Sequence, residues 1–432
     1  MMRTHYRNQV NESLHGKDVR IAGRVHEVRD LGGILFVLVR DQTGISQVIV
    51  KKKDADAKLL QKAEGLVKET AVVVQGTVKT SKQAPGGFEL LPKSLDIVGP
   101  VLKKVPLDVT GRVPAELDTR LDARFIDLRR EQPGAIFKIR ALAQKAFREK
   151  LVELGFQEIN PPSIVSASTE GGSDLFHVQY FEKDAFLAQS PQLYKQLAVL
   201  GGMDKVFMTV PVFRAEKHNT VSHLNEVTQM DAEMGFADDH DALDVLEQVF
   251  LHILESVKKH GAEDLKTLEQ EISVPKKVKR FTYDDVLAKL SKKYKDLKWG
   301  DDFSKEQENA MPELLGEEAF FITDWPTNVR AFYSMPHEKE PKKCKAYDLM
   351  YRGIELASGA QRIHVPELLI KALKARGLDP ADFESYIDAF RYGPCPHAGW
   401  SIGAERLTMQ LTGQKNIREC ALFPRDRHRL LP

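Results

Sequence analysis

Two arginines and two carboxylates are the side chains of this sequence that best suit chemistry on a phosphate compound. Arg214 lies in the stretch FRAEKHNTVSHLNE and Arg406 in GAER, while Asp348 and Glu355 flank the sequence LMYRGI, which contains a tight turn. Guanidinium groups bind phosphate oxygens in pairs, and carboxylates hold Mg²⁺ together with phosphate. The two acids fit an ordinary strand face equally well. Brought together, the four residues would form a site for phosphate and a divalent cation.

The stretch FRAEKHNTVSHLNE (213–226) has three possible interpretations. Its mixed charges could form a solvated turn. Its two histidines, His218 and His223, could be metal ligands. Alternatively, Arg214 and Lys217 could bind a polyanion. These residue types alone leave all three interpretations open.

Small residues precede Glu405 and Arg406 at alternate positions, namely Gly399, Ser401 and Gly403. In a strand, residues without bulky side chains let a ligand approach the backbone closely. Glycines in strands also mark bulges, so this pattern is a weak signal by itself.

Composition argues against several classes of protein. The chain has 432 residues, of which 42% are hydrophobic and 29% charged, so we expect a globular protein of two or three domains. Its net charge of +1 means that any basic surface is local. Cys344, Cys395 and Cys420 lie too far apart for a disulfide framework or a zinc knuckle. Because neither a membrane-spanning run nor a signal peptide is apparent, we expect a cytoplasmic protein.

The secondary structure expected from the sequence differs between the first hundred residues and the rest of the chain. Short β-branched runs occupy the first hundred residues, with one helical segment among them. The expected strands are 18–28, 34–41, 45–52, 70–79 and 87–99, and the expected helix is 54–66. Three strands, a helix and two strands is the order of an OB-fold barrel, a common oligonucleotide-binding scaffold. A small barrel without a ligand would have the same order.

The remainder of the chain has a different pattern. An amphipathic helix is expected at 134–156, and strands and helices of unequal length follow, which favours an α+β fold over a regular βαβ winding. We assign residues 1–104 to the barrel, 105–132 to a hinge and 133–432 to a larger domain. Residues 262–330 have the least informative pattern, and we expect them to be an accessory insertion.

Several motifs together resemble one family, the class II aminoacyl-tRNA synthetases. GFQEINPP (155–162), FRAE…HLNE (213–226) and GAER (403–406) are similar to motifs 1, 2 and 3 of that class. Other stretches resemble archaeal-type aspartyl-tRNA synthetases, namely STEGGSDLF (168–176), FLAQSPQLYKQ (186–196), RLDARFIDLRR (120–130) and FPRD (423–426). The resemblance covers nearly the whole chain. It implies an anticodon-binding OB-fold, a catalytic domain built on an antiparallel sheet flanked by helices, and a homodimer with motif 1 at the interface.

The resemblance also implies a reaction with ATP·Mg²⁺. Such enzymes join aspartate to ATP, giving aspartyl-adenylate and pyrophosphate, and pass the aspartyl group to the terminal adenosine of tRNA. Arg214, Glu355 and Arg406 would be the catalytic residues, and Asp348, Glu355 and Ser358 would hold Mg²⁺. The residues implied in ATP binding are Arg214, Ala215, Glu216, Ser222, His223, Leu224, Glu355, Gly403, Ala404, Glu405 and Arg406.

A charged pocket for aspartate is implied in the same domain. Lys195 and Arg362 would bind its side-chain carboxylate, and Lys195 separates this chain from the similar asparaginyl enzymes, which have an acidic residue there. A lysine ammonium pairs with the side-chain carboxylate of aspartate, whereas the neutral amide of asparagine would leave the ammonium without an ion-pair partner. The residues implied in aspartate binding are Glu170, Gln192, Lys195, Arg214, Asp231, Glu233, Ser358 and Arg362.

The barrel would choose the tRNA. Phe36, Gln47 and Glu89 correspond to anticodon contacts of the family, although Phe36 could be an inward-facing core residue. Relatives that accept only tRNA(Asp) tend to have Trp near position 26 and Lys near position 85, where this chain has His26 and Pro85. That combination is typical of enzymes that also aspartylate tRNA(Asn), which an amidotransferase then amidates.

Three residues depart from the family pattern. Ser222 stands where relatives usually have Arg, Val227 where many have an aromatic residue, and Ser401 where they have Gly. The cation missing at position 222 predicts weaker ATP binding, which Ser222→Arg would tighten. A tRNA(Asp)-specific enzyme, an asparaginyl-tRNA synthetase and an inactive tRNA-binding paralogue are the alternative functions.

Overall fold

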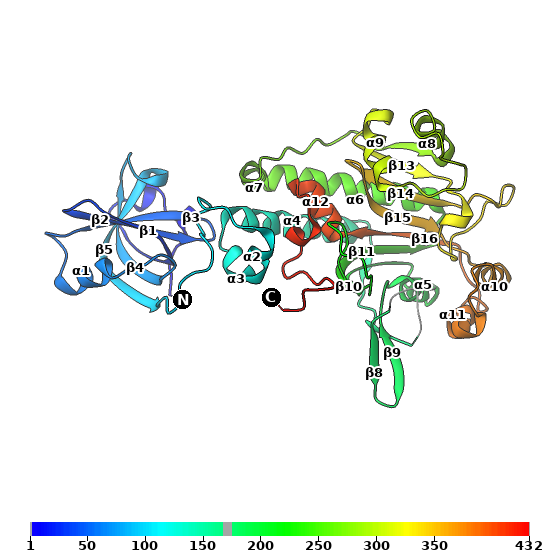
Figure 1. Cartoon of the computed structure of the whole chain (residues 1–432), viewed down its shortest axis with the longest axis horizontal. Helices are drawn as coiled ribbons and strands as arrows, with labels where there is room; N and C mark the ends of the chain where they lie inside the picture. The colour runs from blue at the N-terminus through cyan, green and yellow to red at the C-terminus, as the bar shows by residue number, and fades with distance from the viewer. Residues whose placement is uncertain (1, 167–174, 432) are drawn as a thin grey trace. The chain divides into compact units, whose positions relative to one another are not determined.

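The computed structural model describes residues 2–166 and 175–431. The chain divides into two compact units, Met1–Arg130 and Glu131–Pro432 (Figure 1). Each unit has its own hydrophobic core. Within the described residues, no helix combines the length and the apolar character needed to cross a membrane.

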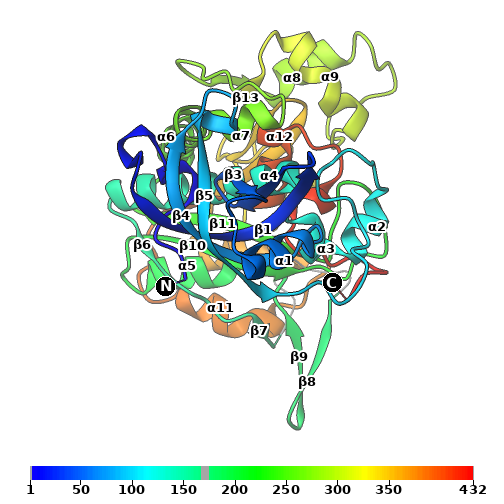
Figure 2. The same ribbon diagram turned by 90° about the vertical axis from the view of Figure 1, so that its left-hand side faces the viewer.

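The first unit is built around a closed barrel of five strands in the order β1-β2-β3-β5-β4 (Figure 2). Its elements are η1 (Arg7–Gln9), η2 (Glu12–Leu14), β1 (Asp18–Asp30), β2 (Ile34–Asp41), β3 (Gly44–Lys51), α1 (Ala57–Glu64), β4 (Ala71–Thr80), η3 (Pro85–Gly87) and β5 (Phe88–Gly99). Alternate apolar side chains, including Val25, Val37 and Val48, fill the interior. The predicted OB-fold is confirmed, with its helix between the third and fourth strands.

The outer face of β2 and β3 carries the residues expected to contact an anticodon. Val37 and Val48 face each other in the interior, so their neighbours Phe36 and Gln47 point to the opposite side of the sheet. Gln47 pairs with Glu89 of β5 in the parallel register. Phe36 is only partly buried and belongs to none of the hydrophobic core clusters. It is therefore not an inward-facing core residue.

The two residues expected to decide tRNA choice lie at irregular points of the barrel. A β-bulge in β1 leaves His26 without a partner residue in β2. Its Nδ1 atom lies 3.0 Å from Nη1 of Arg40. Burial and the charge of Arg40 lower the pKa of His26, which favours the neutral ring. Pro85 opens the 3₁₀ turn between β4 and β5.

The segment expected to be a hinge, residues 105–132, contains α2 (Leu117–Asp122) and α3 (Arg124–Asp127). Its apolar side chains form a small cluster of their own. Arg124 and Asp127 are buried and joined by a hydrogen bond of 2.7 Å. Its role as a hinge stays a prediction.

The second unit is built on an eight-stranded sheet in the order β12-β13-β14-β15-β16-β11-β10-β6. The strands are β6 (Gln157–Glu158), β10 (Lys205–Phe213), β11 (Glu226–Gly235), β12 (Lys279–Thr282), β13 (Ala319–Thr323), β14 (Ala346–Tyr351), β15 (Ile354–Gln361) and β16 (His397–Gly403). Neighbouring strands are antiparallel except β12 with β13 and β10 with β6. A mainly antiparallel sheet flanked by helices confirms the predicted α+β class.

Two long helices, α4 (Glu131–Glu153) and α6 (Asp239–His260), pack on this sheet (Figure 1). The first is the helix expected at 134–156. Its Phe147 is fully buried against Trp400 of β16 in the main core. The other elements are β7 (Ile164–Val165), β8 (His177–Tyr180), β9 (Lys183–Leu187), α5 (Gln192–Leu200), α7 (Ala262–Thr267), α8 (Tyr283–Leu290), α9 (Lys305–Leu315), η4 (Thr327–Val329), α10 (Pro366–Ala375), η5 (Pro380–Phe383), α11 (Glu384–Ala389), α12 (Ala404–Thr412) and η6 (Ile417–Cys420).

Residues 262–330, expected to be an accessory insertion, contribute β12 and β13 to the edge of the central sheet. Phe320 and Ile322 of β13 pack with Met311 and Leu315 of α9 in a common hydrophobic cluster. Burial of these apolar side chains anchors the segment to the sheet. This part of the range therefore completes the central sheet and also fixes α8 and α9 beside it.

Candidate functional site

A cavity of about 370 Å³ in the second unit gathers side chains from distant parts of the sequence. Of the residues implied in ATP and aspartate binding, it is lined by Gln192, Arg214, Glu216, Ser222, His223, Leu224, Glu355, Ser358, Arg362, Gly403, Glu405 and Arg406. Those that do not line it are Ala215, Lys195, Asp231, Glu233 and Ala404, and Asp348, implied in holding Mg²⁺, does not line it either. Glu170 lies outside the described residues.

The loop between β10 and β11 presents Arg214 to this cavity. Asn225 fixes the loop, because its Nδ2 atom donates to the carbonyl oxygens of Arg214 at 2.7 Å and Glu216 at 3.1 Å. The guanidinium of Arg214 has no hydrogen bond or ion pair to any residue in the described part of the chain. It is therefore free to bind an anion in the cavity.

The C-terminal segment braces the same loop. The carbonyl oxygen of Arg425 accepts a hydrogen bond of 2.8 Å from the amide of Asn225. Arg418 donates to the carbonyl oxygen of Thr220 at 3.0 Å and to Asp426 at 2.6 Å. The shape of the loop thus depends on residues between 418 and 426.

The two histidines of this loop do not lie in a metal-binding group. His223 Nδ1 lies 2.6 Å from the hydroxyl oxygen of Thr220, and its Nε2 lies 3.9 Å from Glu216. Burial lowers the pKa of His223, which favours the neutral ring. Across residues 2–166 and 175–431, no three His, Cys, Asp or Glu side chains are placed to hold a metal ion. The metal-ligand interpretation of His218 and His223 therefore has no support.

Two consecutive residues at the start of α12 have different surroundings. Glu405 is buried and accepts hydrogen bonds from Arg140 at 2.7 Å and from the amide of Thr228 at 3.0 Å. Its carboxylate is thus occupied in joining α12 to α4 and β11. Arg406 points to the cavity, where it donates to the carbonyl oxygen of Glu355 at 3.2 Å. Its guanidinium also lies 3.9 Å from the Glu355 carboxylate.

The tight turn expected between Asp348 and Glu355 is confirmed, and it joins β14 to β15. Arg352 and Gly353 at the turn both have positive φ, 51° and 77°. In the resulting hairpin Asp348 lies opposite Ser358. Ser358 and Glu355 line the cavity, whereas Asp348 is buried behind it.

Arg330, which has no motif around it, covers Asp348. Its guanidinium donates to both oxygens of Asp348, at 2.8 and 2.5 Å, and to the hydroxyl of Ser358 at 2.5 Å. It also lies over the ring of Trp325, 4.9 Å from the centroid. Burial and the charge of Glu355 raise the pKa of Asp348 to about 6, although Arg330 acts in the opposite direction.

A set of four buried charges lies beneath the cavity. Lys195 donates to Asp231 at 2.8 Å and to the carbonyl oxygen of Trp400 at 3.2 Å, and its ammonium lies 3.5 Å from Glu233. Arg362 binds both oxygens of Glu233, at 2.8 and 3.0 Å. Although burial would raise it, Arg362 and Lys195 lower the pKa of Glu233. The set is neutral as a whole, and Arg362 is its member that lines the cavity.

Ser401, which departs from the family pattern, joins this set. Its hydroxyl donates to the second oxygen of Asp231 at 2.6 Å. Asp231 is therefore held on both oxygens, by Ser401 and by Lys195. The departure adds a hydrogen bond within the site.

Gln196 and His397 extend the polar floor, and no motif in the sequence indicated either residue. Gln192 donates to Gln196 at 2.9 Å, and Gln196 Nε2 lies 2.9 Å from Nε2 of His397. The hydroxyl of Tyr386 donates to Gln196 at 3.0 Å. Each of these contacts joins residues on different elements, except the pair within α5.

Gly399 is the residue that leaves room for Glu233. A Cβ atom at this position would lie 2.1 Å from Oε2 of Glu233 and 2.3 Å from the carbonyl oxygen of Ala232. We expect Gly399→Ala to lower the free energy of unfolding by more than about 2 kcal/mol, because main-chain atoms of a central strand cannot move aside cheaply. Gly403→Ala, in the same strand, is the control, since its nearest neighbour would be Arg406 at 3.8 Å. Equal unfolding midpoints in urea for the two variants would contradict this expectation.

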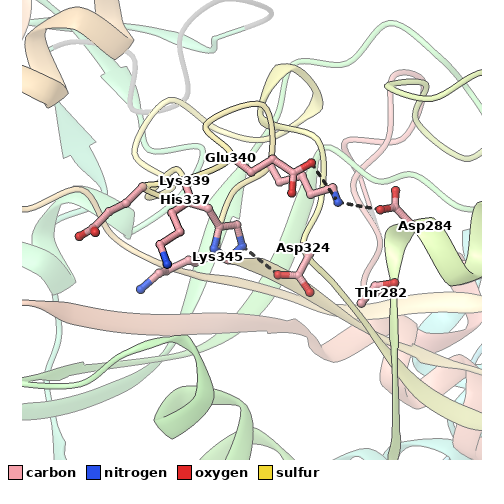
Figure 3. A pocket seen from close by; sticks show the side chains of 9 residues that line it. Thr282, Asp284, Asp324, His337, Lys339, Glu340 and Lys345 are labelled. Carbon is pink, nitrogen blue, oxygen red and sulfur yellow. Dashed lines mark hydrogen bonds and ion pairs between the residues drawn. The ribbon is translucent and has the colours of Figure 1, made fainter.

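A second cavity, of about 570 Å³, lies around the segment before β14 and contains none of the residues expected in a site (Figure 3). Its charged side chains are largely paired with one another. His337 lies 2.8 Å from Asp324, and Lys343 lies 2.6 Å from Asp284 and 3.2 Å from Glu340. We therefore place the candidate site at the first cavity.

Comparison with known proteins agrees with this geometry. Residues 116–427 match the family model described as tRNA synthetases class II (D, K and N), and residues 19–98 match OB-fold nucleic acid binding domain. The chain is 48% identical to the aspartate–tRNA(Asp/Asn) ligase of Methanocaldococcus jannaschii, over 100% of this chain and 98% of the relative. It is 47% identical to the aspartate–tRNA(Asp) ligase of Pyrococcus furiosus, over the full length of both. The structure of asparaginyl-tRNA synthetase from Pyrococcus horikoshii with asparaginyl-adenylate aligns over 100% of both chains, with a TM-score of 0.95 and 32% identity.

Proposed function

This chain belongs to the class II tRNA synthetases of the D, K and N group, and from that premise we propose that it is an aspartate–tRNA ligase acting on both tRNA(Asp) and tRNA(Asn). It activates L-aspartate with ATP and transfers the aspartyl group to the tRNA. The observation that carries this function is one cavity that Arg214, Arg362 and Arg406 all line, with the buried Lys195 beneath it. The full-length relatives named as aspartate–tRNA(Asp/Asn) ligases support the choice of substrates.

The first step needs no nucleophile from the protein. The α-carboxylate of aspartate attacks the α-phosphorus of ATP, the bond to the bridging oxygen breaks, and pyrophosphate leaves. In the second step a ribose hydroxyl of the terminal adenosine attacks the acyl carbon, and AMP leaves. Two anions must therefore be held together, so binding and charge stabilisation supply the catalysis. We expect Arg214, which has no partner among the described residues, to stabilise the α-phosphate, and Arg406 to bind the adenine and the outer phosphates.

The residues at the β14–β15 hairpin fit a divalent cation. Asp348, Glu355 and Ser358 provide carboxylate and hydroxyl oxygens beside the expected position of the phosphates, and Mg²⁺ is usually held by one or two carboxylates together with phosphate. Mg²⁺ would neutralise charge on the outer phosphates and so favour departure of pyrophosphate. Direct binding to Asp348 requires Arg330 to move away, because Arg330 occupies both of its oxygens.

The buried charges favour aspartate over asparagine. The guanidinium of Arg362 lines the cavity, and the buried ammonium of Lys195 adds to the positive potential there. An amide in place of the side-chain carboxylate would offer Arg362 a neutral oxygen instead of a charged one, and its hydrogen bond would therefore be weaker. A direct contact with Lys195 would require it to give up one of its present partners. We place the ammonium group of aspartate toward Gln192 and Asp231.

Charging of two tRNAs by the purified protein tests this function. We expect radiolabelled aspartate to be attached to both tRNA(Asp) and tRNA(Asn), with asparagine inactive in ATP–pyrophosphate exchange. Robust charging of tRNA(Asp) alone would support the tRNA(Asp)-specific alternative. Exchange driven by asparagine would support the asparaginyl enzyme, and no exchange with either amino acid would support an inactive paralogue.

His26 and Pro85 are expected to set the tRNA choice. His26 lacks the bulk of tryptophan, and its lowered pKa disfavours a positive charge, while Pro85 provides no cation. The anticodons of the two tRNAs differ at one base, and a single base contact is worth about 1–3 kcal/mol. We therefore expect the double variant His26→Trp, Pro85→Lys to lower kcat/KM for tRNA(Asn) about tenfold or more relative to tRNA(Asp). A ratio equal to that of the unmodified protein would contradict this assignment.

We place the enzyme in the cytoplasm as a homodimer. Motif 1, at residues 155–162, would form its interface, and aspartyl-tRNA(Asn) would pass to an amidotransferase. Sedimentation of the purified protein tests the dimer.

A further inference from the structure

Ser222 is in contact with a lysine that is distant in the sequence. The ammonium of Lys305 donates a hydrogen bond to the hydroxyl of Ser222. Ser222 and His223 line the cavity at the place where the outer phosphates of ATP are expected. The loop lacks the arginine that relatives usually have at position 222, and Lys305 brings a different cation to the same place.

Lys305 stands on a rigidly held element. It is the first residue of α9, whose N-terminus has a capping box formed by Ser304 and Gln307. Met311 and Leu315 anchor the same helix in a hydrophobic cluster under the edge of the sheet. At Gly353, the turn between β14 and β15 approaches α9 so closely that a Cβ atom would lie 2.9 Å from the Cα atom of Asn309. The helix is therefore fixed beside the hairpin that carries Glu355.

The charge of Lys305 is not neutralised by an ion pair in the described part of the chain. Its ammonium has no carboxylate partner among residues 2–166 and 175–431. Its charge and that of Arg406 both act to lower the pKa of His223, so the three side chains are electrostatic neighbours. An exposed cation without a carboxylate partner among the described residues, beside two groups expected to bind phosphate, provides a site for an anion.

We propose that Lys305 binds the outer phosphates of ATP and supplies the positive charge that the loop lacks at Ser222. This role rests on the proposed function, and it makes α9 part of the nucleotide site. Ser222 orients the ammonium through its hydroxyl and leaves space for it. An arginine at position 222 would place a second cation against Lys305 and would therefore be redundant in this chain.

Lys305→Ala tests the proposal by its effect on ATP. We expect the Kd for ATP, measured by calorimetry, to rise about tenfold, and the KM for ATP in aspartate-dependent exchange to rise equally. A change of this size corresponds to the loss of one charge-assisted hydrogen bond. The KM for aspartate and the unfolding midpoint should stay unchanged, and Lys305→Arg should retain most of the affinity. Lys292→Ala removes a lysine near α8 without a side-chain contact to the site and should leave ATP binding unchanged.

Ser222→Arg provides the complementary test in two backgrounds. We expect it to restore ATP affinity to Lys305→Ala, and to tighten ATP binding less than twofold in the unmodified protein. An unchanged KM and Kd for ATP in Lys305→Ala, with normal exchange by the unmodified protein, would overturn the proposal. Absence of aspartate-dependent exchange in the unmodified protein would instead count against the proposed function.

Discussion

Replacement of Arg214 by alanine is expected to lower kcat for aspartate-dependent ATP–pyrophosphate exchange by about 10²–10³, the typical cost of removing one donor to a developing charge. The reason is its position: the guanidinium faces the cavity without a partner in the described part of the chain. Because it stabilises no other protein group, its removal should leave the free energy of unfolding almost unchanged. Exchange kinetics and urea unfolding measure the two quantities separately.

Two further variants make the Arg214 result specific. Arg214→Lys keeps the charge but loses the paired hydrogen bonds, so we expect it to recover only part of kcat. Arg391→Ala removes a half-exposed arginine that pairs with Glu384 and Asp388, none of which lines the cavity, and should have normal exchange. An Arg214→Ala enzyme with at least half of the normal kcat would refute the assignment.

Replacement of Lys195 by methionine is expected to have two large effects. It leaves Asp231 and Glu233 with one buried cation between them, so the free energy of unfolding should fall by about 3–5 kcal/mol. It also removes positive potential from the aspartate pocket, so kcat/KM for aspartate should fall by about 10³ or more. Thermal unfolding and exchange at saturating ATP provide the measurements.

A second substitution separates these two effects. In Lys195→Met, Asp231→Asn the set of buried charges is neutral again, and Ser401 can still donate to the amide oxygen. We expect most of the stability to return while aspartate activation stays low, and ATP binding by calorimetry should be normal. Recovery of a normal KM for aspartate in this double variant would show that Lys195 acts only through stability.

The sequence predicted those parts of the site that lie within contiguous motifs. Arg214, Glu355 and Arg406 could be found because each occurs in a short stretch with a characteristic order of residues, and the structure places all three at one cavity. The barrel was predictable for a similar reason, since strand alternation and turn residues are local signals.

Residues that act through long-range pairing could not be predicted in this way. Arg330 covers Asp348, and Lys305 meets Ser222, across gaps of 18 and 83 residues. Both arise from the range 262–330, whose sequence pattern gave no indication that it would reach the site. The burial of Lys195 was also unexpected, because side-chain exposure depends on tertiary packing and not on the motif.

The brace on the loop between β10 and β11 has a consequence for the order of folding. Arg418 reaches Thr220 across 198 residues, and Arg427 reaches the carbonyl oxygen of Lys217 across 210. Contacts of such sequence separation form late, because the intervening chain must first be brought together. During synthesis, the sheet and its core can therefore assemble while the nucleotide loop is still unshaped. The capacity to hold ATP would arise only after Arg418 and Arg427 have been synthesised, so a nascent chain that lacks them would not sequester the nucleotide.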